Sequence, residues 1–331
     1  MSLKILHNVN VVQPGDFVLP ATLWIRNGII EKLESGLSSL PEVEYELMDG
    51  EGHLLIPGMI DVHIHGANGF DMMDGSEASN LEGPYLNPKR KGMQNERFLR
   101  HPNLTEMKEI FNEADGLIKM VTIAPELPGG MELISFLKEN GVIIAVAHSD
   151  ATYEEAKQAF EAGASHVTHC FNGMRPIHHR DPGLVVAAFE EEHVSLQAIV
   201  DGIHLHPAIV RMMHRLKGPD GMVLITDALQ AMGLGDGNYV FGGHHVTVSD
   251  GVARLEDGTL VSSTVTMNEA LRLTVETGIS LKDAVQMAST TPARILSLDT
   301  LGRISTGLDA DLVLLNEQFQ VQWTMIKGHI I

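Results

Sequence analysis

Two histidines two positions apart are the first residues in this sequence that could carry out chemistry. His63 and His65 lie in the stretch MIDVHIHG, where apolar residues largely alternate with others as in a β-strand. Side chains at positions i and i+2 of a strand lie on the same face, so both imidazoles point the same way. The ring nitrogens of two such histidines are difficult to satisfy without a shared partner, and a divalent metal ion can be that partner.

More candidate ligands stand at the ends of later strand-like runs. They are Glu82, His148, His169 and Asp227, and the stretch DGIH adds His204. A lone histidine at a strand end is more often a hydrogen-bonded polar group than a ligand, Glu82 could begin a turn, and Asp227 could cap the next helix. The joint pattern favours a metal site, because all these residues fall at the same end of successive strands. Imidazole and carboxylate ligands suit zinc or iron, and manganese less well.

The order of elements predicts an α/β protein with a (β/α)8 TIM-like barrel. In the middle of the chain, strand-like runs such as VIIAVAHSD alternate with helical runs such as YEEAKQAFEAGA, which indicates a parallel sheet. A (β/α)8 barrel builds its site from the C-terminal ends of many strands, whereas a doubly wound sheet uses one switch point. The polar residues at many strand ends therefore favour the barrel. The sequence has no GxGxxG or P-loop pattern, which weakens a nucleotide-binding interpretation.

The two ends of the chain have a different sequence pattern from the middle. Residues 1–56 and 305–331 consist of short strand-like runs separated by turn residues. We expect them to form one small β-sandwich domain beside a metal-dependent hydrolase barrel of residues 57–304. Two unrelated edge hairpins remain the alternative.

Composition limits the class of protein. The chain has 331 residues, of which 44% are hydrophobic, and a net charge of −20. This charge argues against nucleic acid or an anionic membrane surface as a partner, although a local basic cluster could still hold an anionic small molecule. Cys170 is the one cysteine, so no intrachain disulfide can form. With no signal-peptide core and no apolar run of transmembrane length, we expect a cytoplasmic protein.

Several longer motifs carry a resemblance to a known family. They are IPGMIDVHIHG, LEGPYLNPKRKG, AHSDA, THCFNGM, DGIHLHP and LITDAL. Over nearly the whole chain the sequence resembles the amidohydrolase superfamily and, within it, the deacetylases of N-acetylated sugar phosphates. The resemblance implies hydrolysis of N-acetylglucosamine 6-phosphate to glucosamine 6-phosphate and acetate, with one or two divalent metal ions. The alternatives are another phosphorylated N-acyl sugar, such as N-acetylgalactosamine 6-phosphate, and an inactive barrel used for binding.

The resemblance also implies a role for each site residue. Asp227 matches the general base, and His204 matches the group that polarises the acetyl carbonyl. The residues matched to metal ligands are Glu82, His148 and His169 for the main ion, and His63 and His65 for a second. The residues matched to sugar and phosphate contacts are Met93, Gln94, Asn172, Gly173, His204, Leu260, Val261 and Ser262, the last standing where the family usually has glycine. Arg180 matches an arginine that reaches the phosphate in the neighbouring subunit's site, which implies a homodimer.

One interval of the sequence is too short for a complete barrel. His63 would end the first barrel strand and Glu82 the third, yet two βα units occupy on the order of 60 residues. The stretch DGSEASN before Leu81 also lacks the apolar run of a buried strand. We therefore expect roughly 40 to 50 residues to be absent between about Ser76 and Leu81, leaving the barrel incomplete. They are either omitted from the printed chain, with a break between Asn80 and Leu81, or genuinely deleted.

Overall fold

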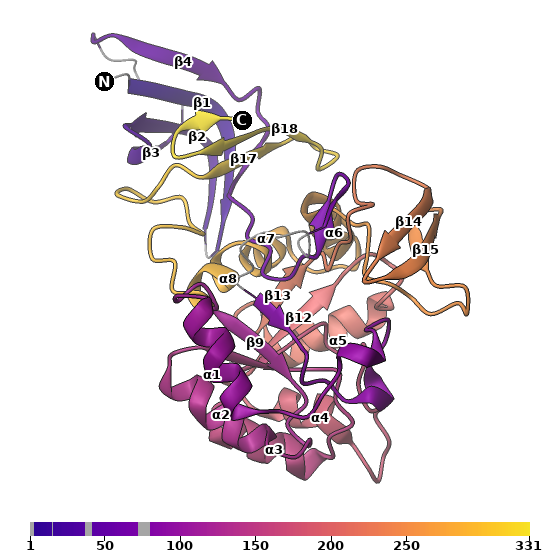
Figure 1. Ribbon diagram of the computed structural model, residues 1–331. Helices are drawn as coiled ribbons and strands as arrows, with labels where there is room; N and C mark the ends of the chain where they lie inside the picture. The colour runs from indigo at the N-terminus through magenta and orange to yellow at the C-terminus, as the bar shows by residue number, and fades with distance from the viewer. Residues whose placement is uncertain (1–2, 15, 37–41, 72–79) are drawn as a thin grey trace. The chain divides into compact units, whose positions relative to one another are not determined.

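A computed structural model describes residues 3–14, 16–36, 42–71 and 80–331. The chain forms two compact units, one from residues 1–61 and 267–331 and the other from residues 62–266 (Figure 1). Among the described residues, no helix is long and apolar enough to cross a membrane.

Within the described residues, the first unit contains an eight-stranded sheet to which both ends of the chain contribute. Its strands are β1 (Leu3–Gln13), β2 (Asp16–Arg26), β3 (Ile29–Ser35), β4 (Tyr45–Asp49), β5 (Leu54–Pro57), β17 (Leu312–Leu315), β18 (Val321–Ile326) and β19 (His329–Ile330). β17 pairs antiparallel with β5, which joins the two ends, and buried residues such as Leu23, Leu55 and Leu312 form the core. The helices of this unit are α6 (Met267–Glu276), α7 (Leu281–Ala288) and α8 (Thr290–Ile295). The domain boundaries at residues 56 and 305 stay a prediction.

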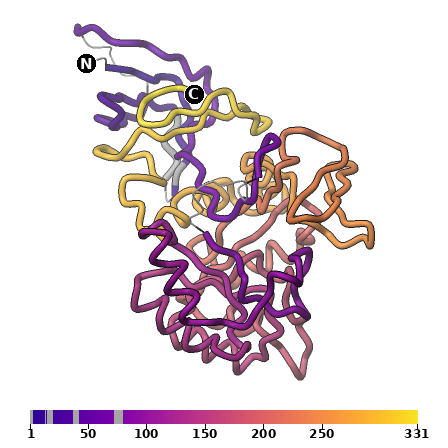
Figure 2. The backbone as a smooth tube through the Cα atoms, viewed as in Figure 1, coloured from indigo at the N-terminus to yellow at the C-terminus, as the bar shows by residue number. Residues whose placement is uncertain are grey.

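Among its described residues, the second unit contains six parallel strands in sequence order, with helices between them. The strands are β8 (Asn80–Glu82), β9 (Met120–Ile123), β10 (Ile143–Val146), β11 (His166–Val167), β12 (Ser195–Ile199) and β13 (Met222–Ile225). The helices are α1 (Leu104–Glu113), α2 (Gly130–Glu139), α3 (Tyr153–Ala162), α4 (Gly183–Glu190) and α5 (Pro207–Lys217). Figure 2 follows this repeated winding from strand to helix. The predicted α/β barrel is confirmed, and its strands form a curled, incomplete barrel.

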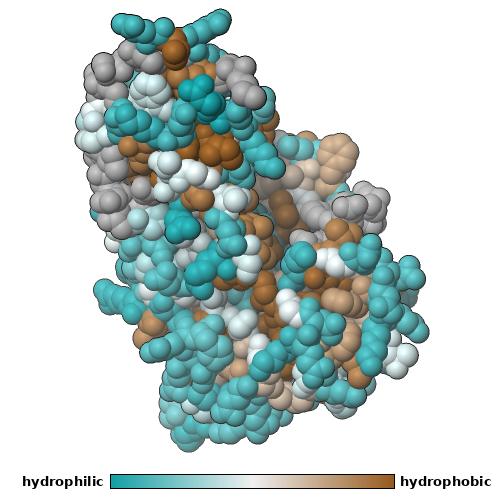
Figure 3. All heavy atoms as spheres, turned by 90° about the vertical axis from the view of Figure 1, so that its left-hand side faces the viewer, coloured by the Kyte–Doolittle hydropathy of each residue, from teal (hydrophilic) through white to brown (hydrophobic). Residues whose placement is uncertain are grey.

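Burial explains why these segments form a barrel wall. Every residue of β9, β12 and β13 is buried, as expected for strands covered on both faces. The helices bury one stripe each, for example Leu133, Ile134 and Leu137 of α2. Over the helical layer, the face drawn in Figure 3 is largely hydrophilic. The helices therefore separate the apolar strands from solvent.

The predicted break between Asn80 and Leu81 is wrong. Both residues belong to β8, where they pair with Met120 and Val121 of β9. The rest of the predicted gap falls on residues 72–79, which lie outside the described residues. Among the described residues, no strand stands between the short hairpin β6 (Gly66–Ala67) and β7 (Phe70–Asp71) and the strand β8. The second strand of a complete barrel is therefore not among them.

The prediction that residues 59–66 form a strand is also wrong, except for Gly66 at the start of β6. Residues 58–65 join no sheet, and Val62 lies in a bend. The His63 carbonyl accepts from Asp227 N at 2.9 Å, and the Val62 carbonyl accepts from Asn80 Nδ2 at 3.0 Å. The segment is thus tied to the end of β13 on one side and to β8 on the other. On the β8 side, the contact is a single hydrogen bond from the Asn80 side-chain amide. A neighbouring strand would form a ladder of backbone hydrogen bonds there.

A small antiparallel sheet is inserted after β13. It consists of β14 (Gly237–Phe241), β15 (His244–Ser249) and β16 (Val252–Arg254). Its core includes Phe241, Val246 and Val261, and Met93 packs against it. The insertion therefore connects the loop that contains Val261 with the loop before the first helix.

The start of helix α3 is stabilised by a capping box, and removing its N-cap residue tests this contribution. Thr152 Oγ1 accepts from Glu155 N at 3.2 Å, and Glu155 Oε2 accepts from Thr152 N at 2.8 Å, a complete capping box. We expect Thr152→Ala to lower the free energy of unfolding by about 1 kcal/mol, measured by urea denaturation.

Thr105→Ala is the matched control. Thr105 lies in the first turn of α1, whose cap is Asn103, so this substitution should not destabilise the protein. Equal losses for the two variants would contradict the capping account.

Candidate metal centre

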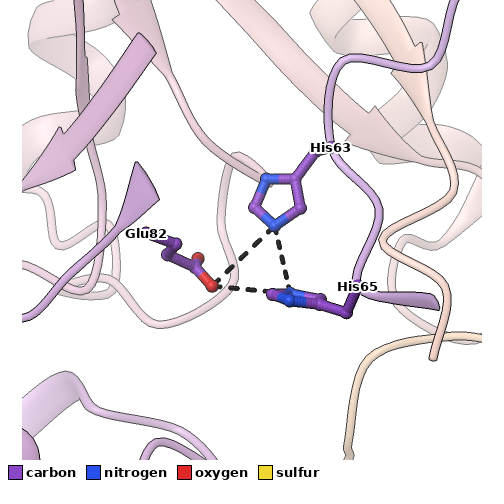
Figure 4. Close-up of side chains that lie close together, drawn as sticks. All are labelled: His63, His65 and Glu82. Carbon is purple, nitrogen blue, oxygen red and sulfur yellow. Dashed lines mark hydrogen bonds and ion pairs between the residues drawn. The ribbon is translucent and has the colours of Figure 1, made fainter. Parts of the chain in front are cut away.

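The HxH pair and Glu82 lie together. His63 Nε2 and His65 Nε2 are 3.2 Å apart, and Glu82 Oε2 is 3.8 Å from His63 Nε2 and 3.5 Å from His65 Nε2. Figure 4 shows both rings turned toward the carboxylate, which comes from the end of β8. The two rings therefore meet at one carboxylate, although their segment is not a strand.

The other carboxylate oxygen of Glu82 faces a second histidine pair. Glu82 Oε1 is 3.2 Å from His148 Nε2 and 2.9 Å from His169 Nε2, and the two Nε2 atoms are 3.2 Å apart. His148 follows β10 and His169 follows β11. Two groups thus share Glu82 and could each hold a metal ion. One carboxylate thus lies between two imidazole pairs, and two ions, if bound, would share it as a ligand.

The far sides of the rings decide which atoms could hold an ion. His148 Nδ1 donates to the Arg90 carbonyl at 2.7 Å, and His169 Nδ1 donates to the Asn172 carbonyl at 3.1 Å. A ring that donates from Nδ1 in its neutral form presents a bare lone pair at Nε2. These lone pairs point at each other and at an anionic oxygen, and such a set of donors suits a cation. Metal-binding histidines are held in the same way by their second nitrogen.

The electrostatics agree with this account. Burial alone would raise the pKa of Glu82, but the nearby histidines, led by His63 and His148, hold it well below its usual range. Burial likewise opposes charge on His65, yet Asp227 and Glu82 raise its pKa to about 9. The buried carboxylate therefore stays ionised and attracts positive charge.

The backbone turns sharply at three of these residues. His148, His169 and Asp227 have φ values of 45°, 31° and 49°. This left-handed region is rare for residues with a side chain and costs on the order of 1–3 kcal/mol each. Each of the three follows soon after the end of a strand, β10, β11 or β13. These three turns lie where side chains must leave the strand direction to reach a common centre.

Asp227 stands beside the HxH pair. Asp227 Oδ1 is 3.0 Å from His65 Nε2 and 3.5 Å from His63 Nε2. Its backbone carbonyl accepts from Ser263 N at 2.8 Å, which fixes the neighbouring loop, where Ser262 also has a positive φ of 42°. The structure therefore brings Asp227 next to the candidate metal ligands His63 and His65.

His204 is oriented by a residue that the sequence analysis did not single out. His204 Nδ1 donates to Asp201 Oδ2 at 2.6 Å, and Asp201 Oδ1 accepts from the backbone N–H groups of Ile203 and His204. Burial would lower the pKa of His204, but this hydrogen bond and the charge of Asp201 raise it. The DGIH motif pairs an acid with a histidine three positions later, which is the signal that could have identified Asp201.

The residues predicted to contact the sugar lie at several places around the centre. Gln94 Nε2 donates to Glu82 Oε2 at 3.0 Å, and the Asn172 carbonyl holds His169. Val261 is buried in the core of the small sheet, against which Met93 packs, and Leu260 bridges to β16. Gln94 therefore joins the ligand group more directly than the sequence indicated.

Arg180 lies on an exposed loop with its two neighbours. Its Nη1 is 2.7 Å from His179 Nε2, and its N–H faces His178 Nδ1 at 3.3 Å. Within the described ranges, its hydrogen bonds are with these neighbours and not with the ligand group. Its predicted role in a neighbouring subunit is thus untested.

Parallel strands whose ends bring two imidazoles and two carboxylates to a further histidine pair are typical of metal-dependent hydrolase barrels. The chain belongs to the amidohydrolase family, because the sequence profile described as "Amidohydrolase family" matches residues 71–331. Members of this family depend on a metal.

Two relatives and one solved structure are similar to this chain over nearly its whole length. The N-acetylglucosamine-6-phosphate deacetylase of Lysinibacillus sphaericus is 32% identical, over 98% of this chain and 97% of its own length. An N-acetylgalactosamine-6-phosphate deacetylase of Escherichia coli O157:H7 is 30% identical, over 93% and 95%. A solved structure of a mutant N-acetyl-D-glucosamine-6-phosphate deacetylase from Mycobacterium smegmatis, in complex with N-acetyl-D-glucosamine-6-phosphate, matches with a TM-score of 0.93. It is 31% identical and covers 100% of this chain and 99% of that one.

The length of the match to one relative is relevant to the short interval between His63 and Glu82. The match to the Lysinibacillus sphaericus protein runs over 378 positions, whereas this chain has 331 residues. Several tens of positions of that relative therefore have no counterpart here. This agrees with a barrel that lacks part of its wall.

Gly173 offers a test of the His148 geometry. Its φ is +63°, and a Cβ there would lie 2.7 Å from His148 Nδ1, where the ring meets the Arg90 carbonyl. We expect Gly173→Ala to displace the ring and weaken zinc binding by about 10–100-fold, as for loss of an outer-shell partner. Competition with a chelating dye measures this affinity.

Gly141→Ala is the matched control, because Gly141 also has a positive φ, +70°, but open space around it. It carries the same kind of backbone strain without a clash. If the two variants bound zinc equally well, the proposed contact with His148 would be wrong.

Proposed function

We propose that this chain hydrolyses the N-acetyl group of N-acetylglucosamine 6-phosphate, giving glucosamine 6-phosphate and acetate. The observation that carries the proposal is Glu82 shared between two imidazole pairs, with Asp227 beside one of them. Relatives that are named deacetylases of this substrate support it.

We further propose zinc or iron as the metal, with one ion held by Glu82, His148 and His169 and a second by His63, His65 and Glu82. The donor set of imidazole nitrogens and carboxylate oxygens fits either metal. When bound, such an ion polarises a carbonyl and lowers the pKa of water.

Asp227 is the proposed general base. Its carboxylate takes the proton of the attacking water and then delivers it to the leaving amine nitrogen. This role requires the ionised form at neutral pH. Burial would raise the pKa of Asp227, but His63 and His65 lower it below its usual value.

His204 is proposed to support the acetyl oxygen as negative charge develops there. Asp201 accepts from Nδ1 of His204, so the ring is held in one orientation and its Nε2 is left for the substrate. A preorganised donor of this kind needs no rearrangement during the reaction.

The phosphate is proposed to bind far from the chemistry, at the Asn172–Gly173 turn and at Arg180 of a neighbouring copy in a homodimer. The exposure of Arg180 is compatible with such a contact. Binding energy from a remote group helps to position the acetyl carbonyl. With one buried cysteine and a phosphorylated substrate, we also propose a cytoplasmic location.

A substrate panel tests the activity. The metal-stripped protein is reloaded separately with zinc and with iron and assayed on four sugars: N-acetylglucosamine and N-acetylgalactosamine, each with and without the 6-phosphate. We expect the highest kcat/KM with N-acetylglucosamine 6-phosphate and a loss of at least about tenfold without the phosphate.

Faster hydrolysis of N-acetylgalactosamine 6-phosphate would support the second candidate instead, which one relative's name favours. Equal rates with and without phosphate would remove the proposed role of Arg180. Bound metal with no hydrolysis of any of the four sugars would support a binding protein.

Asp227→Asn tests the base. We expect kcat to fall about 10²–10⁴-fold, because the amide cannot accept the proton, while zinc still binds. The control is Asp236→Asn, since Asp236 accepts from backbone N–H groups of the small sheet and should not affect turnover. Wild-type turnover in Asp227→Asn would show that another group is the base.

A further inference from the structure

Gln197 is a fully buried amide beside the centre, on β12, to which no role has been assigned above. Its Oε1 is 3.1 Å from His63 Nδ1 and 3.3 Å from His169 N. Its Nε2 is 3.8 Å from Met120 Sδ. One amide oxygen thus contacts a histidine from each of the two imidazole pairs.

The contact with His169 fixes which way the amide faces. A backbone N–H can only donate, so the group that faces His169 N must be the amide oxygen and not the NH₂. The nitrogen then faces Met120 Sδ, a weak acceptor, which agrees with this orientation. The rotation of the Gln197 side chain is therefore determined by the backbone at His169.

This orientation determines the proton position on His63. Because an oxygen lies 3.1 Å from His63 Nδ1, that nitrogen must carry the proton. Nε2 of the neutral ring is then a bare lone pair. It faces His65 Nε2 at 3.2 Å and Asp227 Oδ1 at 3.5 Å, inside the ligand group.

We propose that Gln197 is a positioning residue that holds His63 in the tautomer needed to bind the second ion, and that it links this half of the centre to the His169 half. Since Gln197 contacts ligands and not substrate, it acts through His63. The inference rests on the proposed metal-dependent function and assigns it a further residue.

Gln197→Met and Gln197→Glu separate this role from a structural one. Methionine has a similar length but only a weakly accepting sulfur in place of the amide oxygen, whereas glutamate keeps an oxygen toward His63 Nδ1. We expect Gln197→Met to weaken the second zinc step about 10–100-fold, the usual effect of losing an outer-shell partner, with a smaller change in the first. Gln197→Glu should retain both steps.

The measurement is a calorimetric zinc titration of metal-stripped protein with a competing chelator, with Gln158→Met on the exposed side of α3 as control. The proposal is supported if the wild type binds zinc in two steps and the second step is weakened in Gln197→Met but not in Gln197→Glu or Gln158→Met. Unchanged binding in Gln197→Met, equal weakening of both steps, or a single step in the wild type would each overturn it.

A second measurement does not depend on how the variants fold. Nitrogen-15 NMR of the metal-free wild type at neutral pH should show His63 protonated at Nδ1 and bare at Nε2. The opposite tautomer would overturn the proposal. Failure of the proposed function would be seen differently, as two zinc steps and the expected tautomer with no hydrolysis in the sugar panel.

Discussion

The centre of this protein depends on one electrostatic constraint, the convergence of buried electron-rich atoms. The four Nε2 atoms lie in two groups that share Glu82, Asp227 lies beside one of them, and both groups are largely shielded from water. Without positive charge among them, such a group would be strongly destabilising. Positive charge among them, on a bound cation or on a protonated ring such as His65, therefore stabilises this arrangement. The surrounding structure keeps these atoms together.

The supporting contacts all act on the far sides of the ligands. The Arg90 and Asn172 carbonyls and the Gln197 amide each hold an Nδ1 atom, so each lone pair faces inward. Gly173 has no side chain because the His148 ring occupies that space. The Arg90 and Gln197 contacts come from parts of the chain distant in sequence from the histidines they hold, whereas Asn172 is three positions from His169. Contacts of this kind over-determine the left-handed turns at His148 and His169.

The sequence predicted the ligands better than their supports. The strand-end positions of His148, His169 and Asp227 follow from periodicity and parallel topology, which are local signals. Gln197 lies 134 positions from His63, so spacing in the sequence does not connect them. Asp201 belongs to the DGIH motif, in which only His204 was considered as a site residue. The strand expected around His63 failed for a related reason: a strand needs a neighbour, and pattern alone does not reveal whether one is present.

The incomplete barrel can still hold its centre because the ligands are joined by hydrogen bonds that do not require the absent strand. Val62 is tied to Asn80 of β8, His63 to the backbone of Asp227, and the His63 ring to Gln197 of β12. Each bond crosses between the first segment and a different strand of the wall. Removing a strand from a barrel exposes sheet edges and core, but it need not remove these three anchors. The ligand geometry therefore depends less on closure of the barrel than on the few contacts that position His63.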